Sequence, residues 1–342
     1  MNDHSRVVVI GASAGGVRAL LRLLPGLSKD FPAPVLIVLH IGAHRSHLSE
    51  LINAKGPNRA VVAQTDLVPE AGTIYIAPSD QHLVLEGGVL RLFHGPKEHH
   101  SRPAINPLFR SAALDVGNRA IGVILTGMLD DGAAGLRAIK VCGGTTVVQD
   151  PDDAAEPSMP RSALAVTAVD HVLRLDAMAD LLNNLVNTKN GQPVEAPSWL
   201  RAEHAISLGG EGMHALATIG HPSGYTCPDC GGALFELREG QPVRFLCHTG
   251  HAFSLLSLAA AHAPITDVAL WAALRVVQEK EAILRRLAQV RIDNGTGGHE
   301  ATLAEADSLA SFAQHLRTVV LAAPSVAVGE ESVAAALSYI ER

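Results

Sequence analysis

The first 185 residues contain a series of short, uninterrupted apolar runs, and this series restricts the fold more than any other feature. The runs are rich in Val, Ile and Leu and alternate with helical patterns; they cover residues 7–10, 35–40, 60–63, 73–77, 120–125 and 145–148. Strands that are apolar on both faces are typical of a parallel sheet with helices on either side. The sequence therefore predicts a doubly wound α/β fold with a mostly parallel sheet.

One segment departs from this pattern. Around residues 86–89, strict alternation of apolar and polar residues replaces the continuous runs, with HLVLE before a Gly-Gly turn and VLRLF after it. This pattern indicates a β-hairpin that is inserted in the sheet or added to it.

The second half of the chain differs in composition and suggests three further parts. A polar stretch follows Leu182, then a segment rich in Cys, Gly and Pro, and then two segments of helical period near residues 268–291 and 300–321. A short last helix is expected over residues 331–340. The expected parts are an α/β domain at 1–187, a linker of uncertain structure at 188–221, a small Cys-rich module at 222–258, and a helical hairpin with a tail at 259–342.

Composition excludes several classes of protein. The chain has 27 Lys and Arg against 34 Asp and Glu, a net charge of −7, and no basic run that could follow a phosphate backbone, so nucleic acid is not expected as a partner. Charges and glycines interrupt every apolar stretch before about 18 residues, so no membrane insertion is expected. Four cysteines and a start without a cleavable apolar segment indicate a reducing, cytoplasmic protein.

A glycine-rich turn follows the first expected strand and carries Ser13 at its apex. Residues 11–15 match the G-x-S-x-G elbow of serine hydrolases, in which the serine hydroxyl lies beside free N–H groups at a helix start. The match alone does not separate this elbow from a nucleotide-binding turn or from a purely structural one. A dinucleotide site would need G-x-G-x-x-G spacing and an acidic residue at the end of the next strand.

The next strand ends in His40 instead, and the strand at 120–125 is followed by Asp130 and Asp131. Because the carboxyl ends of parallel strands meet at one edge of a sheet, these residues could form a Ser–His–Asp triad. The alternative is that His40, one of 17 histidines, is an ordinary core or surface residue and that the aspartates cap a helix near Ala133. The chain order Ser, His, Asp differs from that of α/β-hydrolases, which disfavours an ordinary esterase.

Six segments in fixed order resemble the catalytic domain of the CheB family, the bacterial chemotaxis protein-glutamate methylesterases. They are VVVIGASAGG, PVLIVLHI, GTIYIAPSDQHL, RPAINPLFRSAA, VILTGMLDDGAAGL and QDPDDAAEPSMPRSAL. The resemblance implies a domain that hydrolyses glutamate 5-methyl esters on cytoplasmic helices of chemoreceptors. It also implies that glutamine deamidation is possible and that catalysis needs no cofactor.

Matched motif by motif, the resemblance implies that Ser13 is the nucleophile, His40 the base and Asp131, rather than Asp130, the carboxylate. The backbones of Ala14, Gly15 and Met128 become candidate contacts for the oxyanion or the substrate.

The sequence departs from the family pattern in three places. Ala14 stands where the family usually has a hydroxyl residue, and Asn106 replaces the usual Asp, which questions a substrate contact there. The chain begins at the catalytic strand, so no control by an attached receiver domain is expected. The other histidines near the site are expected to tune polarity or to face solvent; the alternative is that His82, or one of the pair His99 and His100, contacts the substrate.

The Cys-rich module contains Cys227-x-x-Cys230 and, 17 residues later, Cys247-x-x-x-His251. Two such pairs are typical of a closed, structural zinc site, and the alternating segments ALFEL and PVRFL indicate the strands of a zinc ribbon. His251 is preferred over His248 as the fourth ligand, and free buried cysteines are the alternative. The ribbon and the helices after it resemble an extension found on some CheB-like proteins.

The expected function is thus a cytoplasmic serine methylesterase that acts on methylated chemoreceptor helices. Recruitment to receptor clusters at the inner membrane face and contact with a receptor methyltransferase would follow from that function. Two alternatives remain: an adaptor that binds partners without turnover, and a hydrolase with another protein substrate.

Overall fold

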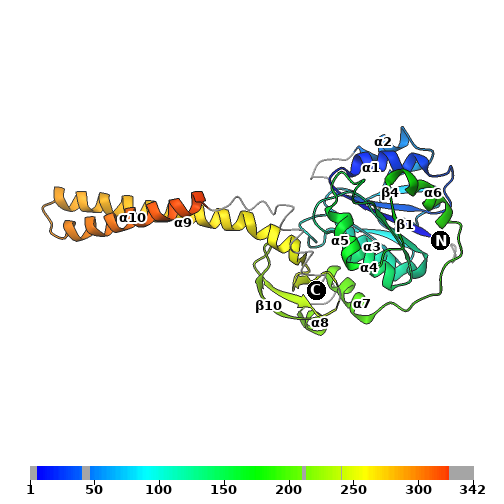
Figure 1. Ribbon diagram of the computed structural model, residues 1–342. Coiled ribbons are helices and arrows are strands. Elements are labelled where there is room, and N and C mark those ends of the chain that lie inside the picture. Colours follow the sequence, from blue (N-terminus) through cyan, green and yellow to red (C-terminus); the bar gives the residue numbers. More distant parts are fainter. Residues whose placement is uncertain (1–5, 41–46, 210–212, 240, 323–342) are drawn as a thin grey trace. The chain divides into compact units, whose positions relative to one another are not determined.

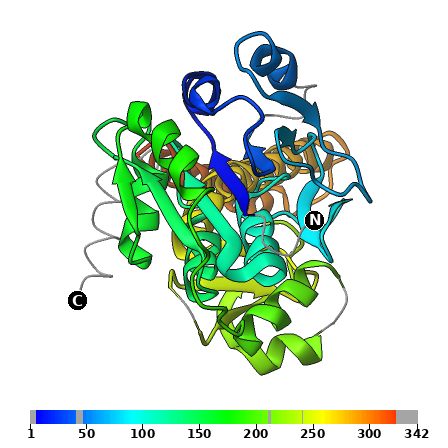
Figure 2. The same ribbon diagram turned by 90° about the vertical axis from the view of Figure 1, so that its right-hand side faces the viewer.

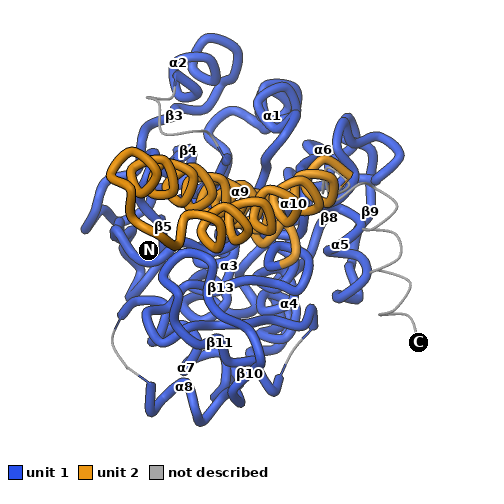
Figure 3. Tube along the Cα trace, turned by 90° about the vertical axis from the view of Figure 1, so that its left-hand side faces the viewer, with its two compact units in different colours: residues 1–258, 333–342 blue, residues 259–332 orange. Residues whose placement is uncertain are grey.

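The structure is a computed structural model that describes residues 6–40, 47–209, 213–239 and 241–322. The chain divides into two compact units, and the described part of one ends at Leu258 while the other begins at Ala259 (Figure 3). The first unit contains all of the described β-strands, and the second consists mainly of two long helices.

A seven-stranded parallel sheet forms the centre of the first unit, in the order β3-β4-β2-β1-β7-β8-β9 (Figure 1). The strands are β1 Val7–Ala12, β2 Val35–Leu39, β3 Arg59–Val62, β4 Thr73–Ile76, β7 Ala120–Ile124, β8 Thr145–Gln149 and β9 His171–Leu173. The expected parallel α/β fold is confirmed. The edge strand β9 was not expected, because three partly exposed residues leave no apolar run in the sequence.

Helices cover both faces of this sheet (Figures 1 and 2). One face carries α1 Gly16–Leu23, α2 Leu48–Asn53 and α6 Leu175–Leu185, and the other carries α3 Ile105–Val116, α4 Ala133–Val141 and α5 Ser158–Val166. Along β1, Val7 and Val9 join the core under α3 and α4, while Val8 and Ile10 join the core under α1 and α6. The residues of the inner strands β1, β2 and β7 are therefore buried on one face or the other, which explains their continuous apolar runs.

The expected β-hairpin is present as a separate two-stranded sheet. Strands β5 His82–Glu86 and β6 Val89–Phe93 pair in antiparallel fashion. The hairpin packs against α3, where the Leu85 N–H donates to the Ser111 hydroxyl at 3.0 Å. It is thus added beside the main sheet and not inserted in it.

The segment expected as a linker contains two helices, α7 Ser198–Ser207 and α8 Met213–Ile219. Leu200 of α7 packs into the core under α3, and Leu216 of α8 joins the core of the small sheet that follows. These contacts need only a few apolar residues. The helices could therefore not be predicted from a segment of mainly polar composition.

A four-stranded antiparallel sheet follows, where the sequence indicated two strands. It consists of β10 Gly220–Thr226, β11 Ala233–Leu237, β12 Arg244–Cys247 and β13 Ala252–Ser254, in that order. The small sheet lies on the same side of the main sheet as α3 and α4 (Figure 2).

The expected helical hairpin is built from α9 Leu255–Asp293 and α10 His299–Ala322, and all of it except the first residues of α9 belongs to the second unit. The two helices are linked by ion pairs, including Lys280 with Glu305 at 3.0 Å and Arg285 with Asp307 at 2.9 Å. Helix α9 begins earlier than the sequence indicated because it continues through Pro264. The helix expected over residues 331–340 lies outside the described residues.

One described helix, α9, is long and apolar enough to cross a membrane on length and composition alone. The expected interruption of this stretch amounts to one charged residue. Between residues 255 and 274, Asp267 is the only Asp, Glu, Lys or Arg.

Candidate active site and candidate metal centre

Three loops at the carboxyl edge of the parallel sheet bring Ser13, His40 and Asp131 together. Ser13 lies in the turn between β1 and α1, His40 directly follows β2, and Asp131 lies in the loop between β7 and α4. Since β1 lies between β2 and β7 in the sheet, the serine loop is flanked by the other two. The topology thus places side chains that are far apart in sequence at one point.

The imidazole of His40 lies between the other two side chains. Its Nδ1 atom is 3.2 Å from the Ser13 hydroxyl, and its Nε2 atom is 2.8 Å from a carboxylate oxygen of Asp131. Ser13 and His40 are half-buried, so a ligand can reach them, whereas Asp131 is fully buried. The three groups form the continuous hydrogen-bonded series that a Ser–His–Asp triad requires.

Asp131 remains ionised in spite of its burial. Desolvation raises its pKa, but the hydrogen bond and charge of His40, together with the positive charge of His99 and the Ile105 N–H, outweigh this effect and lower the pKa to about 2. The carboxylate accepts the N–H groups of Ile105 at 2.6 Å and Asn106 at 3.1 Å. Both donors belong to the first turn of α3, so this helix start fixes the orientation of the carboxylate.

The three residues expected at the oxyanion or the substrate lie beside Ser13. Gly15 is exposed, has a φ of 77° and precedes the first residue of α1, and Met128 is exposed in the loop after β7. Among the described residues, the N–H groups of Ala14, Gly15 and Met128 have no hydrogen-bond partner. These N–H groups are therefore free to donate to a bound ligand.

Two residues of the β7 loop, which sequence reasoning did not single out, fix the serine turn. The carbonyl of Thr126 accepts the Ser13 N–H at 3.0 Å, and the Thr126 hydroxyl donates to the Ala14 carbonyl at 2.9 Å. A Cβ atom on Gly127 would lie 2.8 Å from the Cβ of Ser13, so only glycine fits there. The LTGM motif contains both residues, but its spacing does not reveal these contacts.

Asn106, expected as a departure at a substrate contact, is buried. Its Oδ1 atom accepts the N–H groups of Gly132 at 3.1 Å and Gly135 at 2.8 Å. The Nδ2 group lies 3.1 Å from His99 Nε2. The side chain thus supports the start of α4 and the loop that carries Asp131.

The histidines considered as alternative substrate contacts have other partners. His82 is buried, with Nε2 2.9 Å from the Pro96 carbonyl and Nδ1 accepting the Ala104 N–H at 3.2 Å. Burial lowers its pKa, although the charge of Glu98 opposes this effect. His99 is also buried, and the His100 ring contacts the Phe253 ring in a tilted arrangement at a centroid distance of 5.1 Å.

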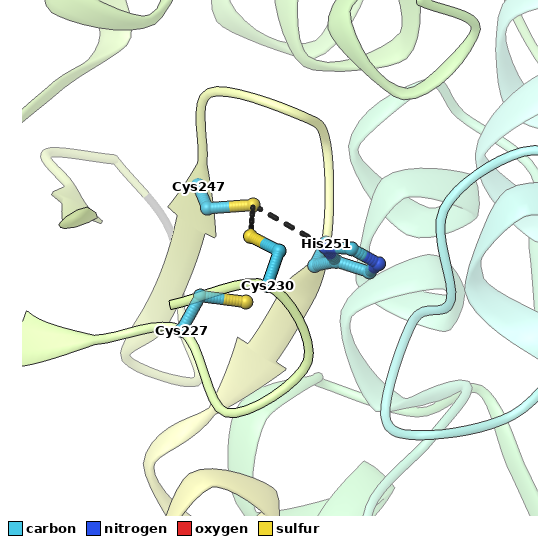
Figure 4. Close-up of side chains that lie close together, drawn as sticks. All are labelled: Cys227, Cys230, Cys247 and His251. Atoms are coloured by element: carbon cyan, nitrogen blue, oxygen red, sulfur yellow. Dashed lines mark hydrogen bonds between the residues drawn. The ribbon is translucent and has the colours of Figure 1, made fainter. Parts of the chain in front are cut away.

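A second group of side chains gathers in the small sheet. Cys227, Cys230, Cys247 and His251 offer ligand atoms that all lie within 4.8 Å of one another (Figure 4). Cys227 and Cys230 lie on the turn after β10, while Cys247 ends β12 and His251 precedes β13. The alternative ligand His248 is exposed and is not part of this group.

Two of the distances between these atoms match those around a tetrahedral zinc ion. With Zn–S near 2.3 Å and Zn–N near 2.0–2.1 Å, the ligand atoms of such a site are separated by about 3.8 Å for S···S and about 3.6 Å for S···N. The Sγ atoms of Cys230 and Cys247 are 3.8 Å apart, and Cys247 Sγ is 3.5 Å from His251 Nδ1. A Cys₃His donor set with these distances could hold zinc.

Comparison with known proteins agrees with the fold and with the ordered motifs. The family profile described as CheB methylesterase matches residues 8–182, about half of the chain. The crystal structure of the Thermotoga maritima CheB methylesterase catalytic domain is similar, with a TM-score of 0.50 and 32% identity; the match covers 53% of this chain and 98% of that one.

Two curated relatives are similar over the same region. A protein-glutamate methylesterase/protein-glutamine glutaminase of Anaeromyxobacter dehalogenans is 45% identical over 180 residues, which are 52% of this chain and 53% of that protein. A putative protein of the same description from Leptospira interrogans is 41% identical over 184 residues, 52% of this chain and 93% of that one. The chain thus spans about half the length of the first relative and nearly all of the second. On the family match, the fold and the relatives together, the chain belongs to the CheB methylesterase family.

Proposed function

We propose that the α/β domain is a serine methylesterase that hydrolyses glutamate 5-methyl esters on proteins. The observation that carries this proposal is the hydrogen-bonded series from Ser13 through His40 to the buried carboxylate of Asp131. Ester hydrolysis needs a nucleophile, a base within reach of its proton, and a group that orients the base. The three side chains supply these roles in that order.

In the proposed reaction, Ser13 attacks the ester carbonyl while His40 accepts its proton through Nδ1. The imidazolium formed is stabilised by Asp131 and gives its proton to the departing methanol. A water molecule then attacks the acyl-enzyme, with His40 again as the base, and releases the glutamate carboxylate.

The N–H groups of Ala14, Gly15 and Met128 are the proposed oxyanion donors. They have no partner among the described residues and lie at the start of α1 and in the β7 loop. Backbone donors do not depend on the side chain, so Ala14 can serve where the family usually has a hydroxyl residue.

The proposed substrates are methylated helices of chemoreceptor-like proteins, since the relatives carry the name protein-glutamate methylesterase. Their second name, protein-glutamine glutaminase, describes deamidation, which would pass through the same acyl-enzyme with ammonia as leaving group. A cytoplasmic location, recruitment to receptor clusters and contact with a receptor methyltransferase are part of this proposal. Binding to nucleic acid and insertion into a membrane are not part of this proposal.

We further propose that Cys227, Cys230, Cys247 and His251 bind one structural zinc ion. The four ligands leave no position open for substrate, so zinc would stabilise the small sheet without taking part in hydrolysis. The proposed functional division of the chain is a catalytic domain at 1–187, a connecting segment at 188–221, a zinc ribbon at 222–258 and a helical hairpin with a tail at 259–342 that serves targeting or regulation.

A fluorophosphonate probe tests the nucleophile directly. We expect one covalent adduct per chain, mapped to Ser13 by peptide mass spectrometry and absent from Ser13→Ala. An adaptor without turnover would give no adduct, and an adduct at another serine would contradict the assignment. Methanol release from a methyl-ester peptide and ammonia release from the matching glutamine peptide then separate the two activities.

A further inference from the structure

The small antiparallel sheet is joined to the catalytic domain by main-chain hydrogen bonds of β13. The Ala252 N–H donates to the Lys97 carbonyl at 3.3 Å, and the His99 N–H donates to the Ala252 carbonyl at 2.9 Å. Residues 97–99 thus lie along β13 like a further short strand. Both segments belong to the first unit. Ala252 precedes Ser254 in β13, and residues 97–99 precede α3 in the chain.

The same contact continues into the active-site loop through side chains. The hydroxyl of Ser254 donates to a carboxylate oxygen of Asp130 at 2.9 Å, and His99 Nδ1 lies 3.2 Å from the same oxygen. Ser254, His99 and Asp130 are each no more than 5% exposed. A buried carboxylate needs donors, and at this position a strand outside the α/β domain supplies one of them.

Asp130 directly precedes Asp131 in the chain, and the two carboxylates have different partners. Asp131 binds His40 and the start of α3, whereas Asp130 binds Ser254 of the small sheet. The loop that carries them contains Leu129 in a left-handed conformation, with a φ of 60°. The Leu129 carbonyl accepts the hydroxyls of Ser158 and Ser162. Because Asp130 and Asp131 are adjacent in the chain, the bonds of Asp130 help to set the position of Asp131.

We propose that Ser254 is a positioning residue for the catalytic carboxylate, and that β13 thereby completes the active site from outside the α/β domain. The sequence resemblance ends before this strand, and none of the six motifs contains Ser254. The proposal rests on the proposed function, because it assumes that Asp131 orients His40 for attack by Ser13.

Replacement of Ser254 by Ala leaves Asp130 buried with one donor fewer. The loop then relaxes, Asp131 shifts relative to His40, and the reaction at Ser13 slows even though the binding surface is unchanged. Small displacements of catalytic groups reduce rates by one to two orders of magnitude. We expect the maximal rate of Ser13 modification by a fluorophosphonate to fall about tenfold, with the concentration for half-maximal rate changed less than about twofold.

Ser254 also accepts the Ser257 N–H at 2.9 Å at the start of α9, so a matched control is needed. Ser257→Ala removes the neighbouring buried hydroxyl, which bonds to Ser254 but not to Asp130. We expect near wild-type modification rates in Ser257→Ala. Ser254→Thr retains a hydroxyl and should restore most of the rate lost in Ser254→Ala.

The experiment measures both kinetic constants of modification in the full chain for wild type and the three variants, after circular dichroism shows each variant to be folded. Equal maximal rates for Ser254→Ala and wild type would overturn this inference and leave the proposed function intact. An equal loss in Ser257→Ala would overturn it as well, because the effect would then be local to the α9 start. Absence of wild-type modification at Ser13 would overturn both proposals. If Ser254→Ala does not fold, failure of the folded Ser254→Thr to keep the wild-type rate overturns the inference.

Discussion

The Nε2 atom of His40 lies 2.8 Å from the buried carboxylate of Asp131, which leaves Nδ1 as the ring nitrogen that faces Ser13. Because an ionised carboxylate can only accept hydrogen bonds, it holds the imidazole proton on Nε2 and leaves a lone pair on Nδ1. This is the tautomer that a general base at Ser13 requires.

Asp131→Asn should therefore disable the base while leaving the fold intact. The amide can donate to Nε2 and so stabilise the opposite tautomer, in which the proton of His40 faces Ser13. We expect the rate of ester hydrolysis to fall about a thousandfold or more, with KM changed much less. Hydrolysis of a methyl-ester peptide at neutral pH measures this, and a loss smaller than tenfold would contradict the role given to Asp131.

Asn106 should matter for stability because its carbonyl oxygen accepts two backbone N–H groups of the α4 start. Asn106→Ala leaves both donors buried without that partner, and we expect a loss of about 2–4 kcal/mol in the free energy of unfolding. Asn106→Asp, the family's usual residue, keeps both bonds and should cost clearly less. Urea unfolding of the two variants measures both losses in the free energy of unfolding. Equal losses would contradict the stabilising role given to the Asn106 carbonyl oxygen.

Glu203 of α7 lies at the centre of a buried ion cluster. It pairs with Arg110 of α3 at 3.0 Å and with Arg244 of β12, and Arg110 also pairs with Glu98. Glu203→Gln leaves the two arginines with less compensation, and we expect a loss of about 3–5 kcal/mol in the free energy of unfolding. The matched control is Glu195→Gln, because Glu195 forms an exposed ion pair with Arg201. This substitution should change the free energy of unfolding by less than about 1 kcal/mol.

The same cluster gives a pH dependence of stability. Burial raises the pKa of Glu203, but the charges of Arg244 and Arg110 outweigh it, so the pKa in the folded protein lies below its ordinary value. The contribution to stability is then fully present above the ordinary glutamate pKa of about 4.3 and is lost as the pH falls through the lowered value. The stability difference between wild type and Glu203→Gln should accordingly be constant near neutral pH and shrink below about pH 4. A difference that grows in acid would contradict this assignment.

Zinc should be bound in about one equivalent per chain. Cys230→Ser removes a proposed ligand and should reduce the zinc content to a small fraction of that value, together with a lower melting temperature. Cys142→Ala is the matched control, because Cys142 is buried at the end of α4 and lies outside the Cys₃His group. Plasma emission spectroscopy of the purified proteins measures the metal, and equal zinc in all three would refute the ligand assignment.

The parallel sheet and the active-site loops could be predicted because the inner strands of the doubly wound fold are buried on both faces. Continuous apolar runs such as 7–10 then mark the strands, and parallel topology brings the residues that follow them to one edge. Strand β9 and helices α7 and α8 could not be predicted, since each contributes only a few buried side chains to cores made by other elements.

The three residues of the proposed triad could be predicted from strand ends and motif order. The contacts that hold these residues in position could not. The contacts of Thr126, Asn106 and Asp130 are tertiary, and each joins segments at least 20 residues apart. Ser254 is the extreme case, 124 residues from its partner Asp130. No periodicity or spacing in the sequence reports such a bond.

The central claim is that Ser13 hydrolyses glutamate methyl esters, and release of methanol tests it most directly. A helical peptide with one glutamate 5-methyl ester is incubated with equal amounts of wild type and Ser13→Ala, and methanol is measured over time. We expect steady release by the wild type and only the uncatalysed background with Ser13→Ala. Equal release by both proteins, or none above background by the wild type, would contradict the claim.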